Sequence, residues 1–559
     1  MSNIAVLGGG ISGLSAAYYL ARLAPQTTKI TLIEGKDRLG GWIKSRRVAP
    51  GKYTSQTELP PISTEKNSVL FEGGPRTLRP KGAGGTVMLE MIQHLGLDND
   101  DLLAVPTTHP SAQNRYIYFN GEINQLPSSL SSALFNKPPV LKSVLLAGAL
   151  ESFRSSRFQQ GQPKDGQEDE SIYSFMERRF NQHAALHLMG AMTHGIYAGD
   201  VKQLSLQSTF RMLHEAERNY NGVIRGLMKG VNTETMRERG MAVRARDHRP
   251  EWFSQLEKMS VVGFKSGLES LPERLLTWLR QRPNVEILTN EPVESIHLLS
   301  NGKEGKIKTR SRELFVDHMI STLPSFTLDS LISSNRLPHL NHNPSVDVAV
   351  VNLAYPSDVK LAYDGFGFLT PHRDTPYPIP LPGTLGVIFD SNALSDQEKD
   401  YQPETTKLTA MIGGSDWEDA FGKTPIDQLD PDVAHDYACR IMRTFLNIDA
   451  KPTHAMVHLQ KQCIPQYLVG HESRMRELHH ALEKQYGQVL SVTGASYLGV
   501  SVPDCIKYSR MLVEELLVSG ALGTRDKAVT GLGKTVQNNQ ELKDGARLSK
   551  GNTNVILKA

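Results

Sequence analysis

The sequence predicts a mixed protein, part α/β and part α+β, and three observations support this prediction. Residues 3–48 contain a strand, a glycine turn, a helix, a second strand and a second glycine turn. Residues 489–517 again contain a strand, a glycine turn and a helix, while 284–299 and 313–324 alternate like strands. Helical periodicity dominates between about 172 and 255. We therefore expect a Rossmann-like domain interleaved with a sheet-based domain and a helical domain.

The bulk composition bounds the class of protein. At roughly 150 residues per domain, a chain of 559 residues suggests three or four domains, fewer if they interleave. The charge balance is 62 − 59 = +3, so nothing indicates nucleic acid as a partner. Cys439, Cys463 and Cys505 form no close cluster, which favours neither a disulfide framework nor a metal site.

Two observations concern targeting and membranes. The first strand begins at Asn3, so we expect no cleavable presequence. No apolar run is long enough to span a bilayer, which needs about 18 residues. The most apolar stretch, 140–150, is interrupted by Lys142; it is interpreted as a core helix in preference to a helix lying on a membrane.

The N-terminal glycines carry the first functional prediction. Gly8, Gly10 and Gly13 fill the pattern G-x-G-x-x-G between a strand and a helix. The first allows a tight turn, the second lets the backbone approach a pyrophosphate, and the third allows close packing of helix and strand. Glu34 lies 21 residues beyond Gly13, where an acidic side chain binds ribose hydroxyls. A glycine-rich turn with an unrelated Glu is the alternative, and the complete strand–helix–strand frame disfavours it.

The next segment narrows the choice of dinucleotide. An acidic residue at Glu34 favours FAD or NAD over NADP. Gly40 and Gly41 follow in "EGKDRLGGWIKS", a second pair that a plain NAD domain does not need. An extended flavin cofactor does, because the chain returns to its pyrophosphate. This start resembles the FAD-dependent superfamily of amine oxidases, phytoene desaturases and GDP-dissociation inhibitors.

Five further stretches make the resemblance more specific. They are "FEGGPRTLRP" (71–80), "HPSAQNRYIY" (109–118), "VVNLAY…GFGFLTP" (350–371), "HLQKQCIPQYLVGH" (458–471) and "TGASYLGVSVPDCI" (493–506). In this order they resemble the oxygen-dependent protoporphyrinogen oxidase family of eukaryotic mitochondria. The resemblance implies oxidation of protoporphyrinogen IX to protoporphyrin IX by FAD and molecular oxygen. Three two-electron steps would each release hydrogen peroxide, in the penultimate step of haem synthesis.

The resemblance also implies a cofactor site that holds FAD non-covalently. The matching residues are Gly8, Gly9, Gly10, Ile11, Ser12, Gly13, Glu34, Gly35, Trp42, Gly74, Pro75, Arg76, Thr77, Val293, Val500, Ser501 and Val502. The last three have independent support, because Ser501, Pro503 and Asp504 form a helix start signal. Cys505 is interpreted as a small buried side chain and not as a covalent flavin link.

The implied substrate is an apolar macrocycle with two propionates, which needs apolar walls and a cationic anchor. Arg115 matches the family's propionate-binding arginine, and a guanidinium suits a carboxylate because it donates two parallel hydrogen bonds. The alternative for Arg115 is a solvent-facing residue before an edge strand. The other matching positions are Gly195, Phe366, Gly367, Leu369, Ile388 and Met411, for which ordinary core packing is the alternative.

No catalytic side chain and no metal-ligand cluster is identified in the sequence. This agrees with flavin chemistry, in which flavin N5 takes the hydride and the protein supplies position and electrostatics. The nearest alternatives are a flavin amine oxidase or carotenoid desaturase, and a non-catalytic escort of the GDP-dissociation-inhibitor type.

Domain boundaries follow from these assignments. The FAD-binding domain is expected at 1–108, 258–325 and 472–522, and the substrate-binding domain at 109–125 and 326–471. A helical, membrane-facing domain is expected at 126–257, with the polar stretch 153–171 as a solvated linker and 523–559 as a mobile tail. The resemblance implies a peripheral location on the intermembrane-space side of the mitochondrial inner membrane. It further implies a ferrochelatase and a second copy of the chain as partners.

Overall fold

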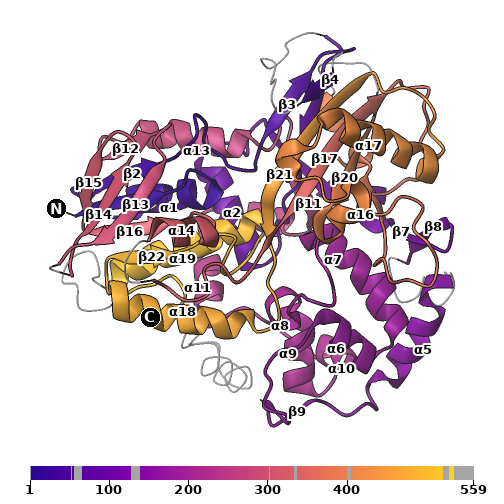
Figure 1. Cartoon of the computed structure of the whole chain (residues 1–559), viewed down its shortest axis with the longest axis horizontal. Helices are drawn as coiled ribbons and strands as arrows, with labels where there is room; N and C mark the ends of the chain where they lie inside the picture. The colour runs from indigo at the N-terminus through magenta and orange to yellow at the C-terminus, as the bar shows by residue number, and fades with distance from the viewer. Residues whose placement is uncertain are drawn as a thin grey trace.

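The structure is a computed structural model, shown in Figure 1. It describes residues 2–51, 53–55, 66–127, 139–300, 302–332, 336–398, 405–519 and 528–533. Most of the polar stretch 51–68, the segment 128–138 and most of the tail beyond 523 lie outside these residues. The predicted combination of α/β and α+β architecture is confirmed.

A parallel sheet organises the N-terminal region. Within the described residues its order is β12-β2-β1-β16-β22. These strands are Val285–Leu288, Lys29–Ile33, Asn3–Leu7, His318–Ser321 and Leu490–Val492, so three distant parts of the chain build one sheet. Its strands are apolar on both faces, as expected for a parallel sheet covered on two sides.

Each face of this sheet is covered by a different set of elements. Ile4 and Val6 of β1 pack against α1 (Ile11–Leu23), α2 (Gly82–His94), α13 (Ser270–Arg280) and α19 (Val502–Val518). Ala5 and Leu7 pack against α14 (Ser325–Leu331), α18 (His471–Tyr486) and the antiparallel strands β13 (Val293–Leu298), β14 (Gly305–Thr309) and β15 (Glu313–Val316). Two short antiparallel pairs complete the region, β3 (Ser45–Val48) with β5 (Val69–Glu72) and β6 (Leu102–Pro106) with β11 (Met259–Phe264).

A larger mixed sheet forms the second region, at the upper right of Figure 1. Among the described residues its order is β4-β21-β17-β20-β19-β18-β7-β8. The strands are Tyr53–Ser55, His454–Pro465, Ser345–Tyr355, Thr406–Gly413, Thr384–Ile388, Gly367–Leu369, Arg115–Phe119 and Glu122–Leu126. One face packs on α17 (Pro431–Leu446) and α16 (Trp417–Phe421). Two short helices, α3 (Pro110–Gln113) and α15 (Asp390–Ala393), contact each other, and α15 also contacts β20.

Helices dominate the third region, at the lower right of Figure 1. They are α5 (Lys142–Glu151), α6 (Ile172–Arg179), a π-helical turn (Ala184–Met189), α7 (Gly190–Tyr197), α8 (Leu206–Thr209), α9 (Arg211–Tyr220) and α10 (Val223–Met228). Two more helices of the predicted helical domain, α11 (Met236–Arg246) and α12 (Pro250–Leu256), pack instead against the parallel-sheet region, where Met241 and Phe253 join the core that includes α2. None of the described helices is both long and apolar enough to cross a bilayer.

Two polar stretches are more ordered than the sequence predicts. Within the predicted linker 153–171, Phe158 is buried against His214 in a hairpin of β9 (Phe158–Gln159) and β10 (Gln162–Pro163). Asp169 accepts hydrogen bonds from the backbone N–H groups of Gln207 and Gly470. Most of this stretch is solvated, as predicted, but an apolar ring and a buried carboxylate tie it to its neighbours.

The second stretch is 528–533, within the predicted mobile tail. Val529 and Leu532 are buried, and Thr530 O accepts a 2.9 Å hydrogen bond from Val492 N of β22. This part of the tail is fixed, because it covers the end of the parallel sheet.

Candidate functional site

Three glycine-containing loops meet at the carboxyl end of β1. Gly40 N donates a 2.8 Å hydrogen bond to Gly9 O, and a Cβ at Gly41 would lie 3.2 Å from the Gly10 Cα. A Cβ at Gly74 would lie 2.3 Å from Trp42 O. The loops 8–13, 40–42 and 73–74 therefore lie directly against one another, as the returning-chain interpretation of the second glycine pair requires.

The first loop needs glycine for two different reasons. Gly8 has a φ of +101°, which L side chains rarely adopt. Gly13 has no room for a side chain, since a Cβ there would lie 1.8 Å from Gly8 O. Gly10, the N-cap of α1, differs from both: no atom lies within 4 Å of a Cβ built on it. The loop is thus tightly packed behind and open in front, at the unpaired N–H groups of a helix N-terminus.

Glu34 closes one end of this cradle. Its carboxylate accepts hydrogen bonds from Gly9 N at 2.7 Å and Lys36 N at 2.9 Å, so it lies at the tip of the glycine loop. A Cβ at Gly35 would lie 3.3 Å from the Pro292 Cα, which brings Val293, the next residue, to the same end. The structure therefore places Glu34, Gly35 and Val293 together.

A second helix N-terminus faces the other end. Ser501 caps α19, and its Oγ accepts a 3.2 Å hydrogen bond from Asp504 N. The helix lies along α1, where Ser509 Oγ donates to Ser12 O at 3.0 Å. Val500, Ser501 and Val502 thus begin a helix that is anchored to the glycine-loop helix. A positive helix end in this position stabilises negative charge on a bound ring.

Cys505 is not a reactive thiol in this arrangement. It is buried in the first turn of α19, and burial raises its pKa to about 11. Its Sγ lies 3.7 Å from Gly499 O. The interpretation of Cys505 as a small buried side chain agrees with these contacts.

Three of the predicted substrate residues share one face of the eight-stranded sheet. Gly367 pairs with Ile388, and Gly386 pairs with both Leu369 and Met411. Because paired residues of antiparallel strands point to the same side, Leu369, Ile388 and Met411 lie on one face. The neighbouring positions Phe368, Val387 and Ala410 pack on the α17 side. The three side chains therefore face away from α17, and each is only partly buried.

Gly195 and Gly367 allow close packing at this face. A Cβ at Gly195 of α7 would lie 2.9 Å from Leu369 Cδ1. A Cβ at Gly367 would lie 2.2 Å from Val387 O, and its φ is +149°. The helix α7 thus borders the apolar face, and both glycines are required by packing as well as by any ligand.

Arg115 lies at the edge of the same face. It is the first residue of β7, and its guanidinium carbon is 4.8 Å from the centre of the Phe366 ring. The Arg115 side chain is exposed in part, and burial followed by the nearby charge of Arg79 lowers its pKa. Arg115 is solvent-facing, as the alternative expects, and also stacks on Phe366, so its binding of a propionate stays a prediction.

Arg76 joins the cofactor loops to the sheet. Its Nη1 donates to Asp390 Oδ1 at 3.0 Å, and Thr409 Oγ1 donates to Asp390 Oδ2 at 2.6 Å. Asn352 Nδ2 donates to Glu72 O at 3.2 Å beside the second glycine loop. Nothing in the sequence singles out Asp390, Thr409 or Asn352, because they meet only in the folded chain.

A buried imidazole, His458, and a half-buried amine, Lys44, lie behind the loop 73–74. A Cβ at Gly73 would lie 2.6 Å from His458 Nε2. Burial, and then the charge of Lys44, lower the pKa of His458 to about 3, so its imidazole is neutral. Burial and the neighbouring Arg46 lower the pKa of Lys44 to about 8. The loop is therefore backed by a neutral ring and a titratable amine.

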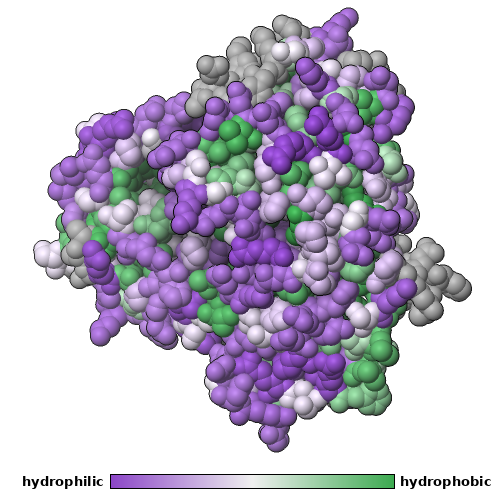
Figure 2. Space-filling view, turned by 45° about the vertical axis from the view of Figure 1, so that its right-hand side comes forward, coloured by the Kyte–Doolittle hydropathy of each residue, from purple (hydrophilic) through white to green (hydrophobic). Residues whose placement is uncertain are grey.

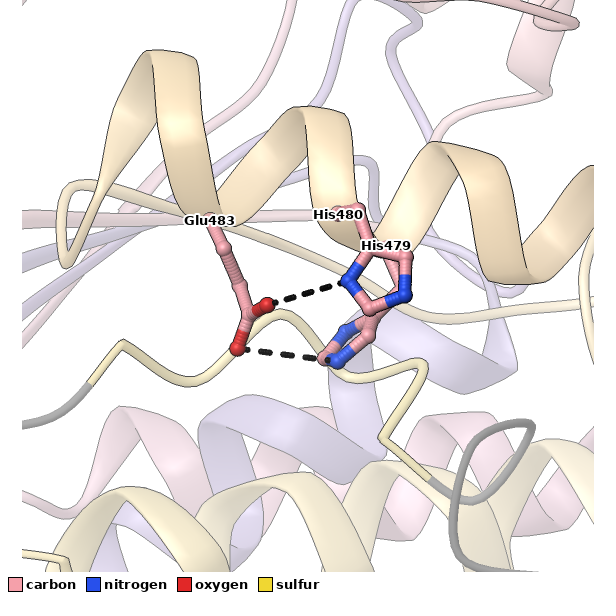
Figure 3. A group of neighbouring side chains, drawn as sticks. All are labelled: His479, His480 and Glu483. Carbon is pink, nitrogen blue, oxygen red and sulfur yellow. Dashed lines mark ion pairs between the residues drawn. The ribbon is translucent and has the colours of Figure 1, made fainter.

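One group of potential metal ligands lies outside this site, among the described residues. Figure 3 shows His479, His480 and Glu483 on α18, with both rings turned toward the carboxylate. The ion pairs measure 3.6 Å and 3.5 Å at the i, i+4 and i, i+3 spacings. His479 Nδ1 lies 2.6 Å from Thr530 Oγ1. The sequence did not indicate this group, and helix-surface pairing accounts for it.

The cradle fits a bound dinucleotide. Two helix N-termini face it, a carboxylate lies where ribose hydroxyls would bind, and Gly10 leaves open space where a pyrophosphate would approach. The buried Nη2 of Arg76 is a further donor that has no partner among the described residues. These are the groups that an extended, doubly charged dinucleotide requires.

Comparison with known proteins identifies the class. The family model of flavin-containing amine oxidoreductases matches residues 11–516. The chain therefore belongs to this family, and FAD is the cofactor for which its glycine loops are built.

The chain also belongs, within that class, to the protoporphyrinogen oxidase family. It is 34% identical to the human protoporphyrinogen oxidase over 518 residues, covering 92% of this chain and 98% of the human protein. It is 35% identical to the Schizosaccharomyces pombe protoporphyrinogen oxidase over 512 residues, covering 90% and 96%. An Exiguobacterium sp. 255-15 structure assigned as a protoporphyrinogen oxidase has the same fold, with a TM-score of 0.69, 21% identity and coverage of 93% and 99%.

Proposed function

We propose that this protein oxidises protoporphyrinogen IX to protoporphyrin IX, using FAD and molecular oxygen. One observation carries the proposal: an apolar sheet face that includes Leu369, Ile388 and Met411 ends at the guanidinium of Arg115. This combination suits a large apolar ring with a carboxylate at its edge. The identity to curated protoporphyrinogen oxidases over most of the chain supports the same substrate.

When bound, FAD supplies the two-electron acceptor for each oxidation. The chain's own residues would bind it without a covalent bond, through the loops 8–13, 34–35, 40–42 and 74–77 and the start of α19. Ser501 and the N-terminus of α19 would stabilise the charge that develops on the reduced ring. The buried pair of Arg76 and Asp390 holds the loop that carries Pro75 and Thr77 against the substrate sheet.

The same residues would orient the substrate. Arg115 would bind one propionate, while Gly195 lets α7 approach the sheet and Phe366 supports the guanidinium from below. Leu369, Ile388 and Met411 would contact the macrocycle and exclude water. No side chain is assigned to remove the pyrrole proton.

We further propose that the protein works on a membrane surface. Leu146 is 66% exposed, Leu150 49% and Phe153 87%, all on or just after α5. Figure 2 shows hydrophobic atoms gathered at the lower right of the molecule, on the side where Figure 1 places α5. Such a patch suits an interfacial helix region. The proposed location is the intermembrane-space side of the mitochondrial inner membrane, as a peripheral protein. The proposed partners are a ferrochelatase that receives the product and a second copy of the chain.

The test is oxidation by the purified, FAD-loaded protein. Protoporphyrinogen IX should first bleach the flavin absorbance without oxygen, and air should then restore it with fluorescent protoporphyrin IX. Coproporphyrinogen III, a primary amine and phytoene serve as competing substrates. If any of these three compounds reduces the flavin faster than protoporphyrinogen IX does, that compound is the better substrate and the proposal is wrong.

A protein that binds no flavin, even when supplied with FAD, would favour the non-catalytic escort. The absorbance spectrum decides this point before any substrate is added.

A further inference from the structure

A second arginine, Arg79, lies close to the predicted substrate anchor. Its backbone is fixed on both sides, because Leu78 exchanges hydrogen bonds of 2.7 and 2.8 Å with Val262, and Pro80 packs beneath Gly85. Leu78 and Pro80 are buried, whereas Arg79 between them is exposed. The loop therefore presents a guanidinium from a rigid base.

The structure connects this loop to Arg115 through the short helix α15. Arg76, three residues before Arg79, is bonded to Asp390, the first residue of α15. Phe389 N donates to Phe366 O at 2.9 Å, and α15 contacts α3, which ends two residues before Arg115. Arg115 lies over the Phe366 ring, so α15 and the Phe366 segment join the two arginine-bearing segments, and the charge of Arg79 is near enough to contribute to the lowered pKa of Arg115.

Neither guanidinium is neutralised within the described residues. No carboxylate lies within ion-pair distance of Arg79 or Arg115, although most other arginines of this region are paired, such as Arg76, Arg46 and Arg38. The lowered pKa of Arg115, for which Arg79 is the second cause after burial, is the mark of two cations that repel each other. A dianionic ligand would remove this repulsion.

Resting on the proposed function, we propose that Arg79 and Arg115 form a two-point clamp for a substrate that carries two carboxylates. Arg115 binds one propionate of the porphyrinogen, and Arg79 binds the other. The two propionates of protoporphyrinogen IX lie on neighbouring pyrroles, so both can reach one edge of the site. The clamp fixes the rotation of the ring in the site and selects against porphyrinogens whose carboxylates are blocked.

The experiment is a cycle between protein variants and substrate esters. The FAD-loaded wild type, Arg79→Gln, Arg115→Gln and the double variant are each assayed on protoporphyrinogen IX and on its dimethyl ester. Arg79→Gln should lower kcat/KM for the diacid roughly tenfold, mainly through KM, because a charge-assisted hydrogen bond is lost. It should leave kcat/KM for the diester within about twofold of the wild-type value. Arg79→Lys should recover part of the loss, since a lysine keeps the charge without the fork.

Arg443→Gln is the matched control. Arg443 lies on α17, is 65% exposed and pairs with the exposed Asp449 just beyond that helix, on the side of the sheet away from the site. It should change neither substrate's kinetics. Equal losses by Arg79→Gln on diacid and diester, or loss of bound flavin in that variant, would overturn the clamp.

A binding measurement separates this inference from the proposed function. Quenching of protein fluorescence by protoporphyrin IX and by its dimethyl ester reports binding without turnover. If the wild type oxidises no porphyrinogen and yet Arg79→Gln selectively weakens binding of the diacid, the proposed function fails and the clamp stands. If turnover is intact and the variant discriminates between acid and ester as the wild type does, the clamp fails alone.

Discussion

The dinucleotide-binding region and the helical region both have a buried apolar core, but they differ in how their exposed apolar side chains are grouped. In the first, the strands β1 and β2 and the helix α1 bury almost every apolar side chain. In the second, Arg179 and Glu151 are fully buried as an ion pair, while Leu146, Leu150 and Phe153 are exposed. A parallel sheet covered on both faces has an obvious interior, whereas the short helices pack around their own apolar core, which includes Ile172 and Phe175, and still leave apolar surface outside.

The difference teaches how each region obtains its stability. The sheet region relies on burial of apolar area and on glycines that allow close approach. The helical region combines its apolar core with the buried pair of Arg179 and Glu151, and both partners must be present because a lone buried charge is costly. Its outer apolar surface is then free to contact something other than the protein.

The largest effect is expected from substitutions of the loop glycines in the dinucleotide-binding region. Gly13→Ala should abolish flavin binding and lower the yield of folded protein, because the Cβ would lie 1.8 Å from Gly8 O. Gly10→Ala should fold normally and still bind FAD at least tenfold more weakly, since its Cβ projects into open space in front of the cradle. Flavin absorbance per protein and circular dichroism distinguish the two.

Gly148→Ala on α5 is the control for these two variants. No atom lies within 4 Å of its Cβ, and the position is far from the glycine loops in sequence. Flavin content should be unchanged. Full flavin loading of Gly13→Ala would contradict the packing argument.

The next largest effect is expected from removing one partner of the buried ion pair inside the helical region. Arg179→Met should destabilise the protein by about 3–5 kcal/mol, because it leaves the buried Glu151 carboxylate without its cationic partner. That carboxylate would keep only the N–H groups of Val223 and Ile224 as donors. Limited proteolysis should cut first within 142–228, and thermal unfolding should show a lower first transition.

An exposed pair provides the comparison for this measurement. Arg443→Met removes an ion pair whose partners are 65% and 76% exposed, so it should change stability by less than about 0.5 kcal/mol. Similar losses in both variants would show that burial does not decide the value of these pairs.

The smallest effect on stability is expected from changes to the exposed apolar side chains of α5, which test the outer surface of the helical region. Changing Leu146, Leu150 and Phe153 together to Ser should weaken sedimentation with anionic vesicles by about tenfold or more. Unfolding should shift little, because these side chains are exposed. Val518→Ser, at an apolar side chain that is 89% exposed at the end of α19, should leave vesicle binding unchanged. Vesicle binding that survives the triple change would remove α5 from the membrane surface.

The cofactor cradle could be predicted well from the sequence because its requirements are local. Gly8, Gly10 and Gly13 follow from backbone sterics within one turn, and Glu34 follows at the end of the next strand. The helix start at Ser501 could also be predicted from the sequence, and in the structure Ser501 is the N-cap of α19. The ordered hairpin around Phe158 and the packed segment 528–533 could not be predicted from the sequence. Both are polar overall, and their few buried contacts are made with residues far away in the chain.

The sequence by itself determined that this chain would form glycine turns at β1 and a capped helix at α19, since both depend on neighbours a few residues away. Only the tertiary structure decided that Asp390 would secure Arg76, that Leu369, Ile388 and Met411 would share one face, and that Arg79 would border Arg115. These relations join segments tens to hundreds of residues apart. Strand register and loop packing set them, and neither leaves a local pattern.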